Sequence, residues 1–106
     1  MKAVKADRNG YVPSIMQHDT SFCYRCGRRD RKLDRHEPFG GANRQKSKAL
    51  GLWIALCHDD CHEGRNGAHG DPALNEIYRQ EAQRAAMETY GWQTEDFIRE
   101  FGKNHL

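Results

Sequence analysis

The sequence predicts a small α+β domain, in which a β-hairpin stapled by zinc precedes two C-terminal helices. Three observations predict this fold class. All four cysteines fall in two short pairs, two strand-like runs lie between these pairs, and strong helix start and stop signals follow residue 70. With 106 residues the chain is expected to form one domain, residues 21–106, preceded by an N-terminal arm, residues 1–20.

The two cysteine pairs are spaced to bind one metal ion. Two residues separate Cys23 from Cys26, three separate Cys57 from Cys61, and about thirty lie between the pairs. Two such pairs can close a tetrahedral site of four sulfur atoms, which is the geometry of structural zinc. Zinc also suits the composition: only 37% of the residues are apolar, the core must be small, and structural zinc contributes on the order of 10 kcal/mol to folding.

Two disulfides are the alternative use of four cysteines, and they require an oxidising compartment. Residues 1–10, MKAVKADRNG, contain no apolar core of the kind a signal peptide has, and no stretch of the chain approaches transmembrane length. The sequence therefore favours zinc over disulfides, a cytoplasmic location and no membrane partner.

The charge is unevenly distributed, although the net charge is only +2. Residues 25–48 contain nine basic and three acidic side chains, whereas residues 71–100 contain seven acidic and three basic ones. This asymmetry indicates either two solvated faces or a basic half that meets a polyanion. The candidate nucleic-acid contacts are Arg28, Arg29, Arg31, Lys32, Arg35, Arg44, Lys46 and Lys48.

Two short extended segments are predicted to form the hairpin. The first, residues 33–37, ends before Pro38, and the second, residues 52–56, is the most strand-like run of the chain. Between them, residues 43–50 fit a short polar helix that ends at Gly51. This hairpin would carry the end of its first strand toward the second cysteine pair.

Two helices are predicted in the last third of the chain. The first begins at Asp71 as N-cap with Pro72 at its first position, and it ends at Gly91. Its expected apolar stripe comprises Leu74, Ile77, Tyr78, Ala82, Ala85 and Met87. The second helix, residues 94–101, is expected to use Thr94 as its cap and to bury Phe97, Ile98 and Phe101.

Several other residues are predicted to have packing roles or no role. Val12, Ile15 and Met16 are expected to dock the arm, Trp53 to lie in the core, and Trp92 to cap the packing after the first C-terminal helix. His58 and the Asp59-Asp60 pair are expected to be exposed rather than ligands. No role is assigned to His18 and His105.

Four side chains exceed what a purely structural zinc domain needs, namely His36, Glu37, His62 and His69. His62 directly follows the last cysteine, and His69 lies just before the helix cap at Asp71. Imidazoles together with a carboxylate can hold a second divalent ion and leave positions open for water and a phosphate. Purely structural roles for His62 and His69 are the alternative interpretation.

Five segments of the chain, read in order, carry a resemblance to a known family: CYRC, DRHEPFGGANRQKS, LWIALCHDDCH, NGAH and the tail DFIREFGKNHL. They resemble the HNH endonucleases of the ββα-metal superfamily, especially small phage-type proteins and the zinc-bearing recombination endonuclease VII type. The resemblance covers about residues 23–106. It implies a ββα-metal core with one catalytic divalent ion, Mg2+, Mn2+ or a similar ion, beside a structural zinc bound by the four cysteines.

The resemblance also implies roles for single residues. His36 matches the first residue of the family's strand-end dyad, a metal ligand, while His62 and His69 match the later metal-binding histidines. Glu37 stands where the general-base histidine is usual, so either Glu37 activates water or it binds the ion and His36 is the base. Two further departures are the three residues inside the second cysteine pair, where two are usual, and the lack of a clear counterpart of the middle asparagine.

The resemblance implies a metal-dependent DNA endonuclease that hydrolyses phosphodiester bonds. DNA is the expected partner, together with phage packaging or recombination proteins, and the expected location is the host cytosol if the protein is phage-encoded. Two other functions are compatible with the sequence. One is a catalytically silent, zinc-stapled adaptor that binds nucleic acid, and the other is a protein-interaction domain.

Overall fold

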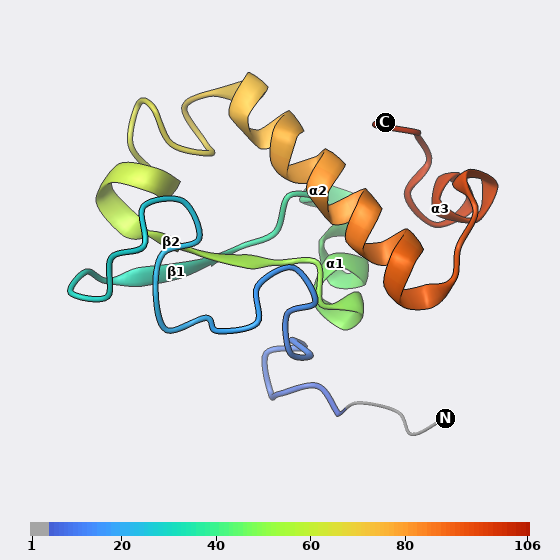
Figure 1. Ribbon diagram of the computed structural model, residues 1–106, viewed down its shortest axis with the longest axis horizontal. Coiled ribbons are helices and arrows are strands. Elements are labelled where there is room, and N and C mark those ends of the chain that lie inside the picture. The colour runs from blue at the N-terminus through green and yellow to red at the C-terminus, as the bar shows by residue number, and fades with distance from the viewer. Residues whose placement is uncertain (1–4) are drawn as a thin grey trace.

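The computed structural model describes residues 5–106 and has a mixed α+β fold, as predicted (Figure 1). The fold combines a two-stranded antiparallel sheet with helices. The elements are, in order, β1 (Leu33–His36), the 3-10 turn η1 (Gly41–Asn43), α1 (Arg44–Leu50), β2 (Ile54–Cys57), the π-helical turn η2 (His58–His62), α2 (Pro72–Tyr90) and α3 (Thr94–Phe101). The first four residues of the predicted arm lie outside the described residues.

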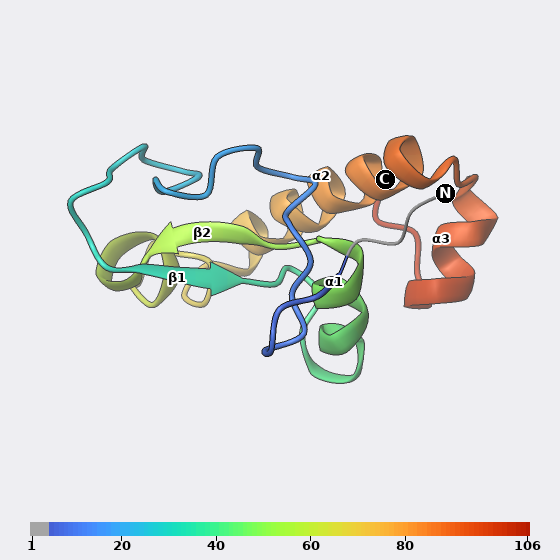
Figure 2. The same cartoon turned by 90° about the horizontal axis from the view of Figure 1, so that it is seen from below.

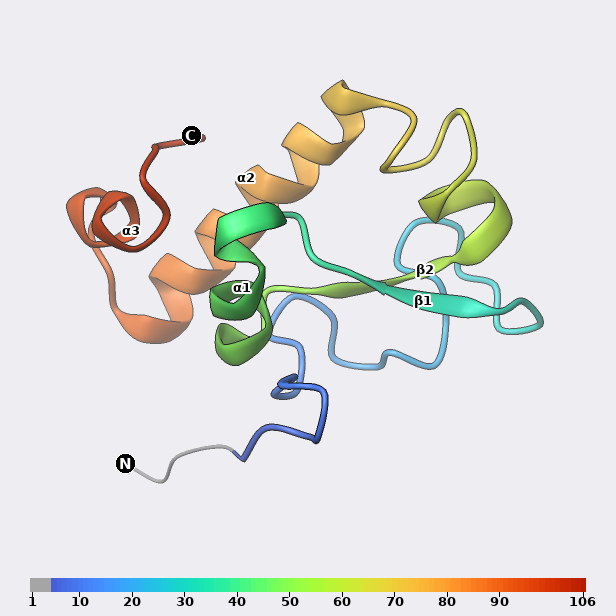
Figure 3. The same ribbon diagram turned by 180° about the vertical axis from the view of Figure 1, so that it is seen from behind.

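The hairpin consists of the two predicted strands, but their ends differ by one or two residues from the prediction. Leu33 lies opposite Cys57 and His36 lies opposite Ile54. Glu37 therefore falls just past β1, and β2 begins two residues later than expected. Figure 3 shows the consequence of this register, because η2 and α1 lie at opposite ends of the hairpin.

The edge of β2 that faces away from β1 is covered by the arm and by the segment of the first cysteine pair (Figure 2). The Ala55 N–H donates to Gln17 Oε1 at 2.9 Å, and the Ala55 carbonyl accepts from the Tyr24 N–H at 2.7 Å. Beside these bonds, Trp53 Nε1 donates to the carbonyl of Val12 at 2.8 Å. An open strand edge is a site of unwanted pairing, and here a buried glutamine and one turn of chain satisfy its polar groups.

The core consists of two clusters, and α2 contributes to both. The first cluster includes the three buried cysteines and contains Cys23, Ile54, Leu56, Cys57, Cys61, Ala68 and Tyr78. The cluster between α1, α2 and α3 contains Phe39, Leu52, Ala82, Ala86, Phe97 and Phe101. Met16 of the arm packs against both clusters, and Ile15 packs against the second, so the predicted docking of these two residues is confirmed. The predicted burial of Trp53 is also confirmed.

Helix α2 begins and ends where the sequence predicts. The Asp71 carboxylate accepts hydrogen bonds from two backbone N–H groups of the first turn, and Gly91 ends the helix with a left-handed φ of 68°. The buried face differs from the predicted stripe, because Ile77 is 50% exposed while Gln83 is fully buried. Gln83 is buried because the C-terminal tail folds over α2, where its amide contacts Asn104 Oδ1 at 2.8 Å.

Helix α3 differs from its prediction in two residues. Its N-cap is Gln93 rather than Thr94, because Gln93 forms a reciprocal capping box with Asp96. Phe97 is buried as expected, whereas Ile98 is 38% exposed and does not belong to the core. None of the helices in residues 5–106 has the length and apolar character needed to cross a membrane.

The arm lies close to Gly51, the residue that ends α1, where the N–H of Ile15 donates to the Gly51 carbonyl at 2.9 Å. Its φ is 76°, and an added Cβ would lie 2.5 Å from the carbonyl oxygen of Pro13. We expect Gly51→Ala to lower the free energy of unfolding by roughly 2–4 kcal/mol, from the left-handed backbone and the overlap together. Gly91→Ala is the matched control, since Gly91 has a φ of 68° but open space around it, and it should cost only about 1 kcal/mol. Equal losses in denaturant unfolding would contradict this account.

Candidate functional site

The four cysteines converge at the end of β2, as the sequence predicts. Their sulfur atoms lie within 4.8 Å of one another, with Cys26 Sγ 3.9 Å from Cys57 Sγ. All four thiols are free. Two sulfur ligands of a tetrahedral zinc ion, each at 2.3 Å from it, lie about 3.8 Å apart. The cluster is therefore compatible with a structural zinc.

A π-helical turn accounts for the three residues between Cys57 and Cys61. Cys57 ends β2, and η2 continues directly from it, closed by a hydrogen bond from the Glu63 N–H to the His58 carbonyl at 2.9 Å. A π turn is wider than an α turn by about one residue. The longer spacing is thus absorbed locally, and Cys61 still faces the first cysteine pair.

The surroundings act differently on individual thiols of the cluster, because they lower the pKa of Cys23 and raise the pKa of Cys26 and of Cys61. Burial opposes the ionisation of Cys23, but neighbouring backbone N–H groups lower the pKa of its thiol to about 7. Thiolate is the form that binds zinc. Tyr78 lies close enough that burial and the charges of Cys61 and Cys23 raise its pKa to about 12. Its hydroxyl is buried without a hydrogen-bond partner among residues 5–106.

We expect Cys57→Ser to lose the zinc ion and to unfold or aggregate, because the remaining three thiolates close only part of the site. Zinc content and circular dichroism of the purified protein measure both effects. Asp59→Asn is the matched control, because Asp59 lies in the same turn with its side chain 81% exposed. Recovery of a folded, zinc-free protein with two disulfides would overturn the zinc assignment.

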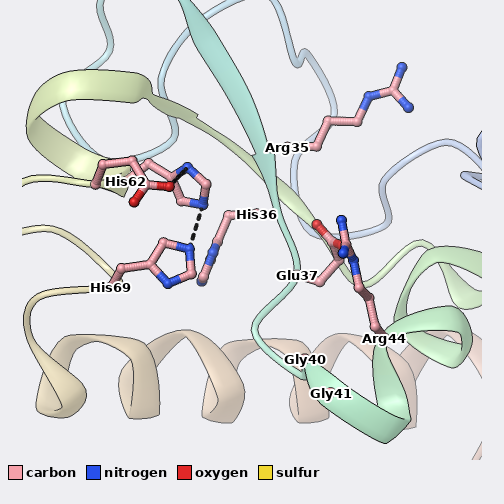
Figure 4. Close-up of a pocket in the computed structure, with 9 residues that line it drawn as sticks. Arg35, His36, Glu37, Gly40, Gly41, Arg44, His62 and His69 are labelled. Atoms are coloured by element: carbon pink, nitrogen blue, oxygen red, sulfur yellow. Dashed lines mark hydrogen bonds and ion pairs between the residues drawn. The ribbon is translucent and has the colours of Figure 1, made fainter.

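Three of the predicted site residues form a second cluster beside the first. His36 comes from the end of β1, His62 from the end of η2, and His69 from the loop before α2 (Figure 4). One ring nitrogen of each lies within 4.8 Å of the others, and His62 Nε2 is 3.0 Å from His69 Nε2. His36 and His62 are buried, whereas His69 is exposed. The cluster therefore has an open side.

The glycine-rich loop is folded tightly onto η2, and this fold places His69. The N–H of Ala68 donates to the Cys61 carbonyl at 2.9 Å, and the N–H of His69 donates to the His62 carbonyl at 3.1 Å. An added Cβ on Gly67 would lie 2.7 Å from the Cys61 carbonyl oxygen. The glycines of this loop thus allow two backbone segments to approach closely, in addition to interrupting a regular helix.

Asp34 orients His62. His62 Nδ1 donates to Asp34 Oδ2 at 2.8 Å, and the same oxygen accepts from His58 Nδ1 at 2.5 Å. Because a carboxylate only accepts, His62 carries its proton on Nδ1, and its Nε2 lone pair faces His69. Burial opposes the ionisation of Asp34, yet the hydrogen bonds from His62 and His58 lower its pKa. His58 is thus part of this network, in contrast to the expectation that it is simply exposed.

Sequence interpretation missed Asp34, although one signal pointed to it. Asp34 and His36 are two residues apart on β1, and residues at this spacing lie on the same face of a strand. An acidic side chain on the face that carries a candidate ligand is the usual source of a second-sphere hydrogen bond. The contact to His62 depends on the pairing register, which the sequence did not specify.

Asn75 holds His36 from the first turns of α2. His36 Nε2 lies 2.7 Å from Asn75 Oδ1, and Asn75 Nδ2 donates to the Pro38 carbonyl at 3.3 Å. Since a carbonyl only accepts, the amide orientation is set, and His36 carries its proton on Nε2. Burial lowers the pKa of His36 to about 4, against the hydrogen bond to Asn75. His36 is therefore neutral at physiological pH, with its lone pair on Nδ1, in a form that can bind a metal ion.

Glu37 does not join the three histidines. Its carboxylate is only 6% exposed and accepts from Arg44 Nε at 2.7 Å. Tyr11 packs against the same pair, and burial followed by the Glu37 charge raises the pKa of its hydroxyl. Glu37 and the histidines nevertheless line one cleft of about 390 Å³, shown in Figure 4 and bordered by Arg35, His36, Glu37, Gly40, Gly41, Arg44, His62, Glu63 and His69.

The eight predicted nucleic-acid contacts divide between two places. Arg28, Arg29, Arg31 and Lys32 precede β1 near the cysteine cluster, whereas Arg35, Arg44, Lys46 and Lys48 lie on β1 and α1. Several of them contact the protein itself, for example Arg29 with Asp19 at 3.4 Å and Lys46 with the Glu100 carbonyl at 2.6 Å. Two of the eight, Arg35 and Arg44, line the cleft.

Comparison with protein families, curated proteins and solved structures finds no match to this chain.

The low pKa of His36 predicts an acid-sensitive fold. The pKa is about 4 in the folded protein against 6.5 ordinarily, so the unfolded chain binds the proton first, and stability falls as the pH drops below about 6.5. Between about pH 7.5 and about pH 5 this effect amounts to roughly 2 kcal/mol. Urea unfolding of wild type and His36→Gln at both pH values should show a smaller acid loss in the variant. The exposed His18→Gln variant is the control, and a loss in His36→Gln equal to that of wild type would contradict the prediction.

Proposed function

We propose that the protein is a divalent-ion-dependent endonuclease of the HNH type, which hydrolyses phosphodiester bonds in DNA. One observation carries the proposal. Three imidazoles converge at the edge of an open cleft, and the exposed side chain of Arg44 lines that same cleft. Ordinary core packing does not require three histidines whose ring nitrogens face one another, since each buried lone pair needs a partner.

The three histidines fit a divalent ion. His62 and His36 each donate one ring N–H to a fixed oxygen, of Asp34 and Asn75 respectively, and each keeps one lone pair. The 3.0 Å between the Nε2 atoms of His62 and His69 is close to the distance of about 3.0 Å between neighbouring ligands at right angles around an ion with bonds of about 2.1 Å. An all-imidazole donor set favours Zn2+, Ni2+ or a similar transition ion over Mg2+, which prefers oxygen.

His36, His62 and His69 would hold the divalent ion, which would supply positive charge to a phosphate oxygen and acidify a bound water. The chain supplies the positioning and the proton acceptor. Sequence alone left Glu37 and His36 as alternative bases. The burial of His36 and its contact with Asn75 favour a ligand role for His36. Glu37, which lines the same cleft, is then the remaining candidate for the proton acceptor.

The second candidate function is a catalytically silent module that binds nucleic acid. The observation in its favour is the contact of Glu37 with Arg44 rather than with the histidine cluster. Such a module would keep the zinc staple and the cationic side of the cleft. Cleavage assays separate the two functions directly.

The test is nicking of supercoiled plasmid by zinc-loaded protein with Mn2+, Ni2+, Co2+, Mg2+ or additional Zn2+. Wild type should nick the plasmid with at least one ion. His62→Ala should lose activity by about 100-fold or more and should lose binding of the second ion, measured calorimetrically. The structural zinc should remain, because Cys61 and not His62 belongs to that cluster.

His18→Ala is the control, since His18 is exposed and belongs to neither cluster. Salt-sensitive DNA binding without cleavage by any ion would replace the nuclease with the silent module. If His62→Ala keeps both its cleavage activity and its binding of the second ion, the three histidines are not the catalytic site.

A further inference from the structure

The ion pair between Glu37 and Arg44 is asymmetric in its exposure. The Glu37 side chain is 6% exposed, whereas the Arg44 side chain is 56% exposed. A pair that stabilises a surface has two exposed partners and contributes little, and burying a carboxylate carries a desolvation penalty. This arrangement therefore costs stability at Glu37 and holds the guanidinium of Arg44 in place at the wall of the cleft.

Arg44 retains hydrogen-bonding capacity toward the cleft. A guanidinium has five N–H donors in a planar fork, and its Nε–H is used by Glu37. Hydrogen bonds to Glu37 and to Tyr11 raise the pKa of Arg44, so its charge is permanent. Planar guanidinium groups with free donors are the preferred partners of phosphate oxygens.

The floor of the cleft beside Arg44 is bare backbone. Gly40 and Gly41 line it, and an added Cβ on either glycine would meet nothing within 4 Å. The other acidic residue of the cleft, Glu63, belongs to the histidine end, where its carboxylate is 3.6 Å from His62 Nδ1. The Arg44 end is therefore open, unobstructed by side chains and lined by an exposed cation.

We propose that Arg44, held by Glu37 and floored by Gly40 and Gly41, binds the phosphate next to the one that lies at the three histidines. The cleft then engages two consecutive phosphates of a single nucleic-acid strand, so that its substrate class is an oligonucleotide rather than an isolated phosphodiester. The placement of the cleaved phosphate at the histidines rests on the proposed function. The binding of an oligonucleotide phosphate by Arg44 does not require cleavage.

The first experiment measures binding without hydrolysis. A fluorescent single-stranded oligonucleotide is titrated in EDTA-free buffer without added divalent ion, at several salt concentrations. Arg44→Ala should weaken binding about 10-fold at low salt and reduce the slope of log affinity against log salt by about 0.7, the value of one phosphate contact on a single strand. Arg84→Ala is the control, because it removes one exposed cation from α2, outside the cleft and outside the candidate nucleic-acid contacts. The affinity of Arg84→Ala should stay close to that of wild type.

The second experiment compares two substrates under cleavage conditions. Bis(4-nitrophenyl) phosphate has one phosphodiester and no neighbouring phosphate. Arg44→Ala should lower kcat/KM for DNA about 10-fold more than kcat/KM for this small ester, whereas Glu37→Gln should lower both to a similar extent if Glu37 is the base. Equal losses on both substrates in Arg44→Ala would place Arg44 at the cleaved phosphate and overturn the proposal.

Two further outcomes keep the proposal independent of folding and of the nuclease. Arg44→Ala leaves Glu37 unpaired, and if this variant is unfolded, Gly40→Val replaces it in the binding experiment. The space at Gly40 is open, so the added side chain narrows the floor of the cleft. Unchanged oligonucleotide affinity in Gly40→Val would refute the phosphate site. If wild type cleaves neither substrate, the proposed function fails and only the binding experiment tests the phosphate site. In that case, an oligonucleotide affinity and a salt slope in Arg44→Ala equal to those of wild type would refute the phosphate site as well.

Discussion

Convergence of four thiols at one end of the hairpin is the constraint on which the rest of the structure depends. Three of the four cysteines are buried, and they join the loop that follows the arm, the end of β2 and the turn η2. A two-stranded sheet is marginally stable alone, and the apolar clusters beside it are small. A metal ion held by thiols from separate segments of the chain would restrain the ends of this hairpin, on which the pairing of β1 with β2 depends.

The histidine cluster is built on this register. Leu33 pairs with Cys57, which brings Asp34 to within hydrogen-bonding distance of His62 across the start of η2. The loop that carries His69 is bonded to the same turn. His36 is reached from the opposite side, by Asn75 of α2. Each buried imidazole thus has one ring nitrogen held by a neighbouring side-chain oxygen.

The two ends of the cleft differ in the charge of their side chains. At the histidine end, burial keeps His36 neutral, with a pKa of about 4, so that a lone pair is available. At the other end a buried carboxylate keeps Arg44 in place while its charge stays exposed. Neither arrangement is what a domain of this size needs for folding, since each places polar groups where apolar contacts would stabilise more. This combination supports an oxyanion-binding role for the cleft.

The sequence by itself determined the α+β class, the cysteine cluster, the limits of α2 and the proximity of three histidines, because each depends on local signals: ligand spacing, caps and strand-like runs. Tertiary structure decided the rest. Whether Glu37 faces the histidines or Arg44 depends on the turn after β1, and the roles of Asp34 and Asn75 depend on contacts between distant segments. Gln93 in place of Thr94 as cap, and the exposure of Ile98, likewise follow from how α3 packs. Side-chain partners across elements are selected by register and packing, which no local pattern encodes.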